Sequence, residues 1–305
     1  MRLTVPKQPL INKVEKYSLN IMLLPGMILT FIFCYLPIFG IIMAFQKFSP
    51  VRGFFQSRFV GLYNFQLLFQ QELFLRTIWN TVYLSLGKIL LGVIVPVILA
   101  LLINELLIVR IKKFIQTTLL APYFISWAIL SGVLMAVFSF DGPINQLLAL
   151  LKLQPIQFLT SNAWFPGILV VSDVWKGMGI NIVIYLAAIT NIDPNLYEVA
   201  SIDGAGYFKK AMKITLPSIM PMIMLLFILS MGNILNAGFE QIFMMYNPAV
   251  YQSSDIIDTY VYRVGIIQLQ YSVSAAAGLL KSIVSCVLVS LSYLLAYKFT
   301  DYKVL

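Results

Sequence analysis

Long apolar segments separated by short polar connections dominate the hydrophobic pattern of this chain. A helix needs about 20 mostly apolar residues to cross the roughly 30 Å hydrocarbon core of a bilayer. Six segments meet this requirement, namely Leu19–Phe45, Thr77–Ile103, Ile115–Ser139, Phe165–Thr190, Ile214–Leu235 and Val273–Tyr297. Strands of transmembrane barrels are much shorter, and only helices or closed barrels satisfy the backbone in lipid. The pattern therefore predicts an all-α, polytopic membrane helical bundle with six transmembrane helices.

The composition indicates the same class. Hydrophobic residues make up 60% of the chain and charged residues 11%, which lies outside the usual range of soluble domains. We find no internal repeat in the sequence and no loop large enough to form a second domain. We therefore expect a cytoplasmic N-terminal arm at residues 1–18, one membrane domain at residues 19–297 and a short cytoplasmic tail at residues 298–305.

The distribution of Lys and Arg predicts the orientation of the bundle. With the N-terminus inside, twelve of these cations fall on the cytoplasmic side and six on the outer side. Cytoplasmic loops carry the excess of cations, so both termini and the fourth connection are expected in the cytoplasm. Anionic lipid at the inner leaflet accounts for the net charge of +9, which therefore implies no nucleic-acid partner.

The fourth connection carries signals for the start and the end of a short helix. Asp193 can cap a helix N-terminus, and Pro194 suits the first helical position. Gly204 can end the helix because glycine readily adopts a left-handed backbone conformation. These signals predict a helix near residues 194–204.

One face of this predicted helix is small and apolar. Leu196, Ala200 and Gly204 recur at a spacing of four, so they share a face that another protein can approach closely. Glu198 lies off that stripe, where it can meet a cation on a partner. The alternative interpretation is a capped connector that has no partner.

The spacing resembles the EAA loop of importer-type ABC permeases, in which Glu, a small residue and Ala precede a Gly and a later Ile-x-Leu-Pro. Val199 replaces the first Ala of the motif, and the other motif positions match. The resemblance implies that this helix is the cytoplasmic coupling helix, which docks on the ATP-hydrolysing subunit. It assigns the ATPase-coupling role to Glu198, Ala200, Asp203, Gly204, Leu216 and Pro217.

Three further segments narrow the resemblance to the LplB-type permeases, a carbohydrate and polysaccharide branch of the family. They are Pro122-Tyr123-Phe124-Ile125-Ser126-Trp127, Asp173-Val174-Trp175-Lys176-Gly177, and an outer series that runs from Glu240-Gln241 through Tyr246-Asn247-Pro248 to Asp255–Gly265. The resemblance covers about Leu23 to Tyr297. It implies a type I ABC importer permease fold and the uptake of oligosaccharides through a bacterial plasma membrane.

The same resemblance implies a set of partners. A second, related permease would enclose the path, two ATPase subunits would bind ATP and Mg²⁺, and an extracellular sugar-binding lipoprotein would deliver the oligosaccharide. This chain has no glycine-rich phosphate loop and no histidine, so we expect it to be no enzyme and to bind no cofactor or metal. Cys34 and Cys286 lie inside spans and predict neither a disulfide nor a metal site.

Candidate substrate contacts are polar or aromatic residues within or beside the spans. Charges inside spans normally face protein or water, and the spacing of Asp173 and Lys176 lets them share one helix face. We expect them to interact with each other or with a neighbouring helix. Amides and aromatic rings can bind sugars, although buried amides also join helices in ordinary bundles. The substrate-path candidates are Asp173, Trp175, Lys176, Asn181, Tyr185, Asn233, Asn236, Phe239, Glu240 and Gln241.

The outer loop from Gly238 to Gly265 is expected to face the sugar path and the docked binding protein, with a short amphipathic helix over residues 255–264. Three alternatives remain open. The permease could carry a solute other than a sugar, or the chain could be an ion-coupled secondary transporter with Asp173 as its ion site. A membrane enzyme acting on a lipid-linked sugar would have only Asp255 and Asp258 as an outer carboxylate pair.

Overall fold

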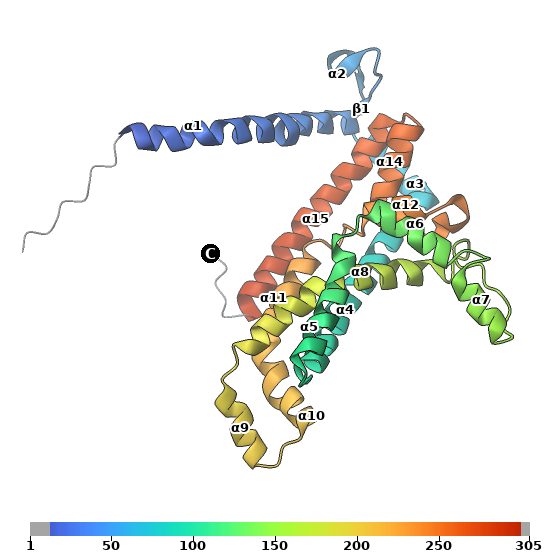
Figure 1. The fold of residues 1–305 in the computed structure, drawn as a ribbon. Helices are drawn as coiled ribbons and strands as arrows, with labels where there is room; N and C mark the ends of the chain where they lie inside the picture. The colour runs from blue at the N-terminus through green and yellow to red at the C-terminus, as the bar shows by residue number, and fades with distance from the viewer. Residues whose placement is uncertain (1–12, 300–305) are drawn as a thin grey trace, which may run out of the picture.

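The computed structural model of the protein describes residues 13–299, which are almost entirely helical (Figure 1). Five helical segments are long and apolar enough to cross a membrane, and a bent pair of helices makes a sixth when it is taken as one span. The five are Asn20–Phe45, Glu72–Asn104, Phe165–Thr190, Tyr207–Met231 and Tyr271–Leu291. The predicted all-α membrane bundle is confirmed.

The first span leaves the bundle. Helix α1, Lys13–Thr30, continues through a π-helical turn at Phe31–Tyr35 into a 3-10 segment at Leu36–Phe45. This 3-10 segment packs on the C-terminal helix α15, Tyr271–Phe299, whereas α1 extends away from the other helices in Figure 1. Its apolar surface therefore has little contact with the rest of the chain.

Helix α1 starts earlier than the predicted first span. Because it begins at Lys13, residues 13–18 of the expected arm are helical. The remainder of that arm, residues 1–12, and residues 300–305 of the expected tail lie outside the described residues.

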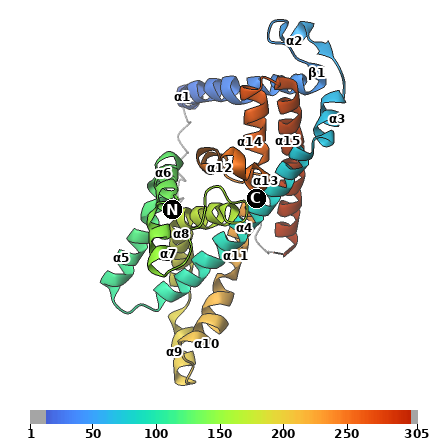
Figure 2. The same cartoon turned by 90° about the vertical axis from the view of Figure 1, so that its right-hand side faces the viewer.

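A small hairpin follows the first span. Strand β1, Gln46–Lys47, pairs antiparallel with strand β2, Arg58–Phe59, and helix α2, Gly53–Gln56, lies between them. These strands form the single sheet found within residues 13–299. In Figures 1 and 2 this hairpin lies at one end of the molecule, and helix α3, Tyr63–Gln70, leads from it into the bundle.

The third predicted span is not one continuous helix, which corrects the expectation for Ile115–Ser139. Helix α5, Val109–Leu120, continues as a 3-10 turn at Ala121–Phe124. Helix α6, Trp127–Val137, then leaves at an angle of 105°. The bent pair is the sixth candidate span.

The local sequence explains this break. Pro122 lies in the first turn of the 3-10 segment, and Ile125 has an extended backbone with φ −82° and ψ 132°. The Ser126 hydroxyl then accepts a hydrogen bond from the Ile129 N–H at 3.4 Å, so Ser126 caps a new helix. Within this apolar run, one helix therefore ends at Phe124 and the next begins at Trp127.

Helices α4, Glu72–Asn104, and α8, Phe165–Thr190, cross at the centre of the bundle and pack along each other. Helix α7, Pro143–Leu150, lies in the connection between α6 and α8. After α8 the chain forms helix α9, Pro194–Ile202, at the end of the molecule opposite the hairpin (Figures 1 and 2).

Helix α9 is the short capped helix that the sequence predicts. The Asp193 carboxylate accepts a hydrogen bond from the Asn195 N–H at 2.9 Å, and Gly204 has a φ of +72°. Helix α10, Tyr207–Lys210, follows and runs through a π-helical turn at Ala211–Thr215 into α11, Leu216–Met231. The π-helical turn stands directly before Leu216-Pro217, where the missing proline N–H interrupts regular α-helical bonding.

Short helical segments make up the outer series between α11 and α15. They are α12 at Phe239–Met245, a 3-10 turn at Pro248–Val250, α13 at Tyr251–Ser254, α14 at Ile257–Tyr262 and a π-helical turn at Arg263–Ile267. The helix predicted over residues 255–264 is therefore divided between two of these elements. Ile256, Tyr260 and Val264 are buried together, as expected for its apolar face.

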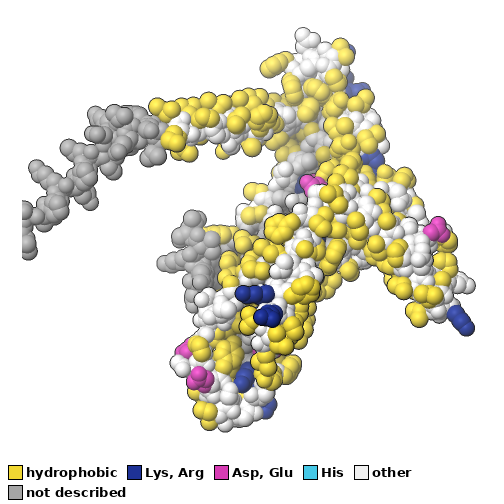
Figure 3. All heavy atoms as spheres, in the orientation of Figure 1, with side chains coloured by type: hydrophobic (Ala, Val, Ile, Leu, Met, Phe, Trp, Pro, Cys, Tyr) yellow, Lys and Arg dark blue, Asp and Glu magenta, His cyan; other side chains and the backbone are white. Residues whose placement is uncertain are grey.

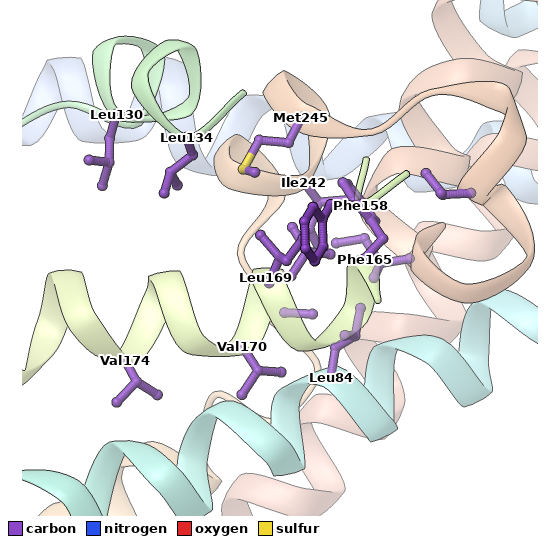
Figure 4. Close-up of a cluster of buried hydrophobic side chains, with 14 residues drawn as sticks. Leu84, Leu130, Leu134, Phe158, Phe165, Leu169, Val170, Val174, Ile242 and Met245 are labelled. Atoms are coloured by element: carbon purple, nitrogen blue, oxygen red, sulfur yellow. The ribbon is translucent and has the colours of Figure 1, made fainter. Parts of the chain in front are cut away.

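The apolar core joins these elements to α4 and α8. Leu84 of α4, Leu169 of α8 and Ile242 of α12 are fully buried in one cluster, which also includes Leu130 of α6 (Figure 4). Hydrophobic side chains also cover most of the molecular face seen in Figure 3. Many Lys and Arg side chains instead lie toward the end that carries α9 and α10, where α5 also begins.

A buried ion pair fixes the outer series. The Asp255 carboxylate is fully buried and accepts hydrogen bonds from Arg263, with Nη1 2.9 Å from Oδ1 and Nη2 2.5 Å from Oδ2. The guanidinium also lies over the Tyr251 ring at 4.5 Å. Burial opposes the Arg263 charge, but the hydrogen bonds and charge of Asp255 outweigh burial and raise the pKa of Arg263.

Removing one member of this pair should destabilise the bundle because a buried charge is left without its partner. We expect Arg263→Met to lower the free energy of unfolding by about 3–5 kcal/mol, and Arg263→Met combined with Asp255→Asn to cost less. Thermal unfolding in detergent measures both effects. The exposed Glu72–Arg76 pair supplies the control, since Glu72→Gln should change the midpoint little. A double variant less stable than the single variant would contradict this account.

Candidate functional site

A polar cleft opens at the centre of the bundle. Helices α4 and α8 and the segment that links α11 to α12 enclose a volume of about 280 Å³. Backbone and apolar side chains form part of its wall. The polar side chains that line it are Ser85, Lys88, Asp173, Asn181, Ser230, Asn233 and Asn236.

Lys88 is the most constrained residue of this cleft. Its side chain is only 8% exposed, and its Nζ donates to the Ala237 carbonyl at 2.7 Å and to Oε1 of Gln241. A third contact joins Nζ to Oδ1 of Asp173 at 3.4 Å. One ammonium group therefore connects α4 to α8, to α12 and to the linking segment.

Gln241 holds the other side of this network. Its side chain is fully buried, and its Nε2 donates to the Leu169 carbonyl and to the Ser172 hydroxyl, both at 2.8 Å. Gly238 makes the close approach possible, because a Cβ at this position would lie 2.9 Å from Nζ of Lys88 and its φ is +89°. The network therefore depends on a glycine between the linking segment and α12.

Three of the substrate-path candidates make defined contacts in this region. Of the two expected arrangements the structure has the second: Asp173 pairs with Lys88 on the neighbouring helix α4 and not with Lys176. The Lys176 Nζ donates to the Tyr123 carbonyl at 2.8 Å and lies 5.7 Å from the Trp127 ring. Lys176 therefore holds the break between α5 and α6. The Gln241 side chain does not face the cleft, because it is fully buried and bonded to Lys88.

The remaining substrate-path candidates divide into two groups. Asn181, Asn233 and Asn236 line the cleft beside Asp173, as a shared site requires. Four other candidates do not line the cleft. Trp175 is 38% exposed elsewhere on α8, and Tyr185 is fully buried in the core. Phe239 stacks on Phe243, and Glu240 is exposed on α12.

The polar groups of the outer series mostly bond within the chain. The Asn247 amide donates to the Leu159 carbonyl at 3.0 Å, and Asp258 accepts from Lys281 at 2.5 Å. Asp255 is committed to Arg263. Asn247, Asp255 and Asp258 therefore have partners within the chain, and the two carboxylates lie in separate ion pairs.

Several cleft residues carried little signal in the sequence. Lys88 could be recognised as an ionisable residue inside a span, but its partners could not be assigned. Ser85 and Ser230 gave no signal, because a hydroxyl in an apolar helix commonly bonds its own backbone. No group of three or more metal-ligating side chains occurs in the described part of the chain.

A second candidate site lies on α9. Leu196, Val199 and Ile202 expose 49%, 59% and 85% of their surfaces, and Glu198 is exposed beside them. No side chain of α9 is buried. Apolar side chains exposed at the polar end of a membrane protein are suited to docking on another protein.

Hydrogen bonds tie α9 to the start of the fifth span. The Tyr197 hydroxyl lies 2.9 Å from Oγ1 of Thr215, which ends the π-helical turn before α11. Lys210 Nζ donates to the Ser201 hydroxyl at 2.7 Å. These two hydrogen bonds connect α9 to the segment that leads into α11.

A helical membrane bundle with a central polar cleft and a protruding, exposed helix at one end is the architecture of a transport permease. The chain belongs to the family described as binding-protein-dependent transport system inner membrane component, whose model matches residues 89–300. It is thus the membrane component of an ABC importer, a transport subunit and not an enzyme.

Similar proteins include two from Bacillus subtilis strain 168. The polygalacturonan/rhamnogalacturonan transport system permease protein YteP is 39% identical over 97% of this chain and 92% of its own length. Protein LplB is 40% identical over 92% of this chain and 89% of its own length. Both are therefore similar to this chain over most of its length, which agrees with the resemblance seen in the sequence motifs.

Solved structures agree. A chain of a bacterial ABC transporter involved in the import of the acidic polysaccharide alginate superposes with a TM-score of 0.86 at 37% identity, covering 96% of this chain and 100% of that chain. A bacterial alginate ABC transporter in complex with alginate pentasaccharide-bound periplasmic protein gives a TM-score of 0.85 at 37% identity, covering 96% and 99%.

The geometry predicts which lysine is coupled to Asp173. In a double-mutant cycle, Lys88→Met and Asp173→Asn should show an interaction energy of about 0.5–3 kcal/mol, because each single change leaves the other charge without its partner. Thermal unfolding of the detergent-solubilised protein measures it. The matched cycle of Lys176→Met with Asp173→Asn should be additive. Coupling to Lys176 in place of Lys88 would contradict the geometry.

Proposed function

We propose that this chain is the permease subunit of an ATP-driven importer of oligosaccharides of the carbohydrate or polysaccharide class. The observation that carries the proposal is a cleft lined by amides, hydroxyls and one partly exposed carboxylate. One similar relative is named for polygalacturonan and rhamnogalacturonan, and one similar structure for alginate. Sugars offer many hydroxyl groups, which such side chains bind while weakly polar walls accept the ring faces. An extracellular binding protein would deliver the sugar.

The substrate path would run through the cleft between α4, α8 and the segment that links α11 to α12. Asp173, Asn181, Asn233 and Asn236 are the residues we propose to contact sugar. Because the cleft is open in this single chain, a second permease would close it. Helix α1 extends away from the bundle with an apolar surface, which suits packing against that second permease.

We propose that α9 is the coupling helix and lies in the cytoplasm with both termini. The cation-rich start of α5 and the two lysines that end α10 lie toward the same end as α9, in agreement with the positive-inside rule. Two partner ATPase subunits would hold ATP and Mg²⁺. Their closure would move α9, and the Tyr197–Thr215 contact would pass this movement to α11 and switch the cleft between inward and outward access.

Coupling should depend on residues that α9 exposes. We expect Glu198→Ala to reduce retention of the ATPase subunits about tenfold, since a loss of about 1.4 kcal/mol at an interface has that effect. Gly204→Leu should act similarly because a branched side chain at a φ of +72° strains the end of α9. Pull-down of the ATPase from solubilised membranes measures retention.

The control for this experiment is Glu72→Ala, an exposed glutamate at the far end of the bundle. It should leave retention unchanged. All three variants should reach the membrane in equal amounts. Full retention and full uptake in both α9 variants would exclude α9 as the coupling helix.

The energy source separates an ABC importer from an ion-coupled transporter. Uptake of oligosaccharide by cells that carry the complete transporter should persist after ionophores collapse the ion gradients, provided that ATP is kept constant. It should stop when the ATPase subunits are inactivated by substitution. Uptake that follows the ion gradient and survives inactive ATPase subunits would identify a secondary transporter. Uptake of a non-sugar solute alone would retain the importer and change its cargo.

A further inference from the structure

The charged side chains of the cleft indicate which class of sugar this chain accepts, provided that sugar passes through the cleft as proposed above. Lys88 and Asp173 are the two charged side chains in the cleft lining. They are not equally available to a ligand. Lys88 is 8% exposed, whereas the Asp173 side chain is 34% exposed.

Lys88 has no free hydrogen-bond donor. An ammonium group has three donors, and Nζ of Lys88 has three acceptors within the protein: the Ala237 carbonyl, Oε1 of Gln241 and Oδ1 of Asp173. Gln241 is itself fixed by its bonds to Leu169 and Ser172. A negatively charged ligand could therefore bind Lys88 only by breaking this network.

Asp173 presents the opposite case. Its Oδ1 contacts Lys88, and its Oδ2 has no hydrogen bond to any residue in the range 13–299. Ionised carboxylate oxygens only accept hydrogen bonds. Asn181 and Asn236, which also line the cleft, can both donate and accept. A ligand in the cleft thus meets one exposed carboxylate and several amides, with the lysine charge already committed.

We infer that the cleft selects neutral sugar residues over uronate residues, with Asp173 as the group that binds a sugar hydroxyl. A hydroxyl that donates to an ionised carboxylate makes a charge-assisted hydrogen bond. A uronate carboxylate would instead bring a second negative charge toward Asp173 without a free cation to neutralise it. The chain would thereby differ from the structural neighbour involved in the import of the acidic polysaccharide alginate.

A matched pair of ligands tests this selection in the assembled transporter. Ser230→Cys, in a background of Cys34→Ser and Cys286→Ser, places a thiol in the cleft outside the Lys88 network and outside the proposed sugar contacts. The rate of maleimide labelling is measured with pentagalacturonate and with its methyl ester, which has the same backbone without the charges. Mannuronate pentasaccharide and its ester provide a second backbone.

We expect the esters to slow labelling about tenfold more than the free acids at equal concentration, because the uronate carboxylates are repelled by Asp173. Equal or better protection by the free acids would overturn the inference. Failure of all four ligands to slow labelling would contradict the sugar path itself, and the inference with it. Better protection by the free acids would leave the proposed sugar path intact, whereas no protection by any ligand would not, so the two failures are distinguishable.

Substitutions then test the assigned residue. Asp173→Asn should abolish or reverse the preference, because the amide does not repel the uronate and Lys88 loses its counter-charge. Asp141→Asn changes an exposed carboxylate in the connection between α6 and α7 and should leave the preference unchanged. A preference that persists in Asp173→Asn would overturn the role of Asp173.

Discussion

A lysine buried in an apolar span is the constraint on which the centre of this bundle depends. On insertion scales a charge at mid-bilayer costs about 2.5–3.5 kcal/mol, so Lys88 requires acceptors from the protein. Its acceptors come from Asp173 on α8, from Gln241 on α12 and from the Ala237 carbonyl between α11 and α12. That carbonyl is free to accept because the fifth span has already ended.

The same constraint explains the shape of the cleft. The chain must leave helical geometry near Gly238 to bring Gln241 over Lys88, and this irregular segment opens space beside Asn233 and Asn236. The cleft is consequently lined by polar side chains although it lies among apolar spans. At the other end, Tyr197 and Thr215 connect the exposed helix α9 to the same span, α11, whose far end borders the cleft. One helix thus joins the proposed coupling site to the proposed sugar path.

The sequence predicted features whose causes are local. The spans follow from runs of apolar residues, and α9 follows from Asp193 at its start and Gly204 after its end. Contacts between distant residues could not be predicted in this way. Asp173 has Lys176 as a helical neighbour, but its partner is 85 positions away, and Gln241 is 153 positions from Lys88. The break at Ser126 was missed because hydropathy alone does not reveal a helix cap inside an apolar run.

A structure of the assembled transporter, trapped with a neutral oligosaccharide inside, tests the central claim most directly. The account predicts a sugar hydroxyl about 2.5–3.0 Å from a carboxylate oxygen of Asp173, while Lys88 keeps its bonds to Ala237 and Gln241. Sugar bound away from this cleft, or Lys88 turned out of its network to contact the sugar, would contradict it.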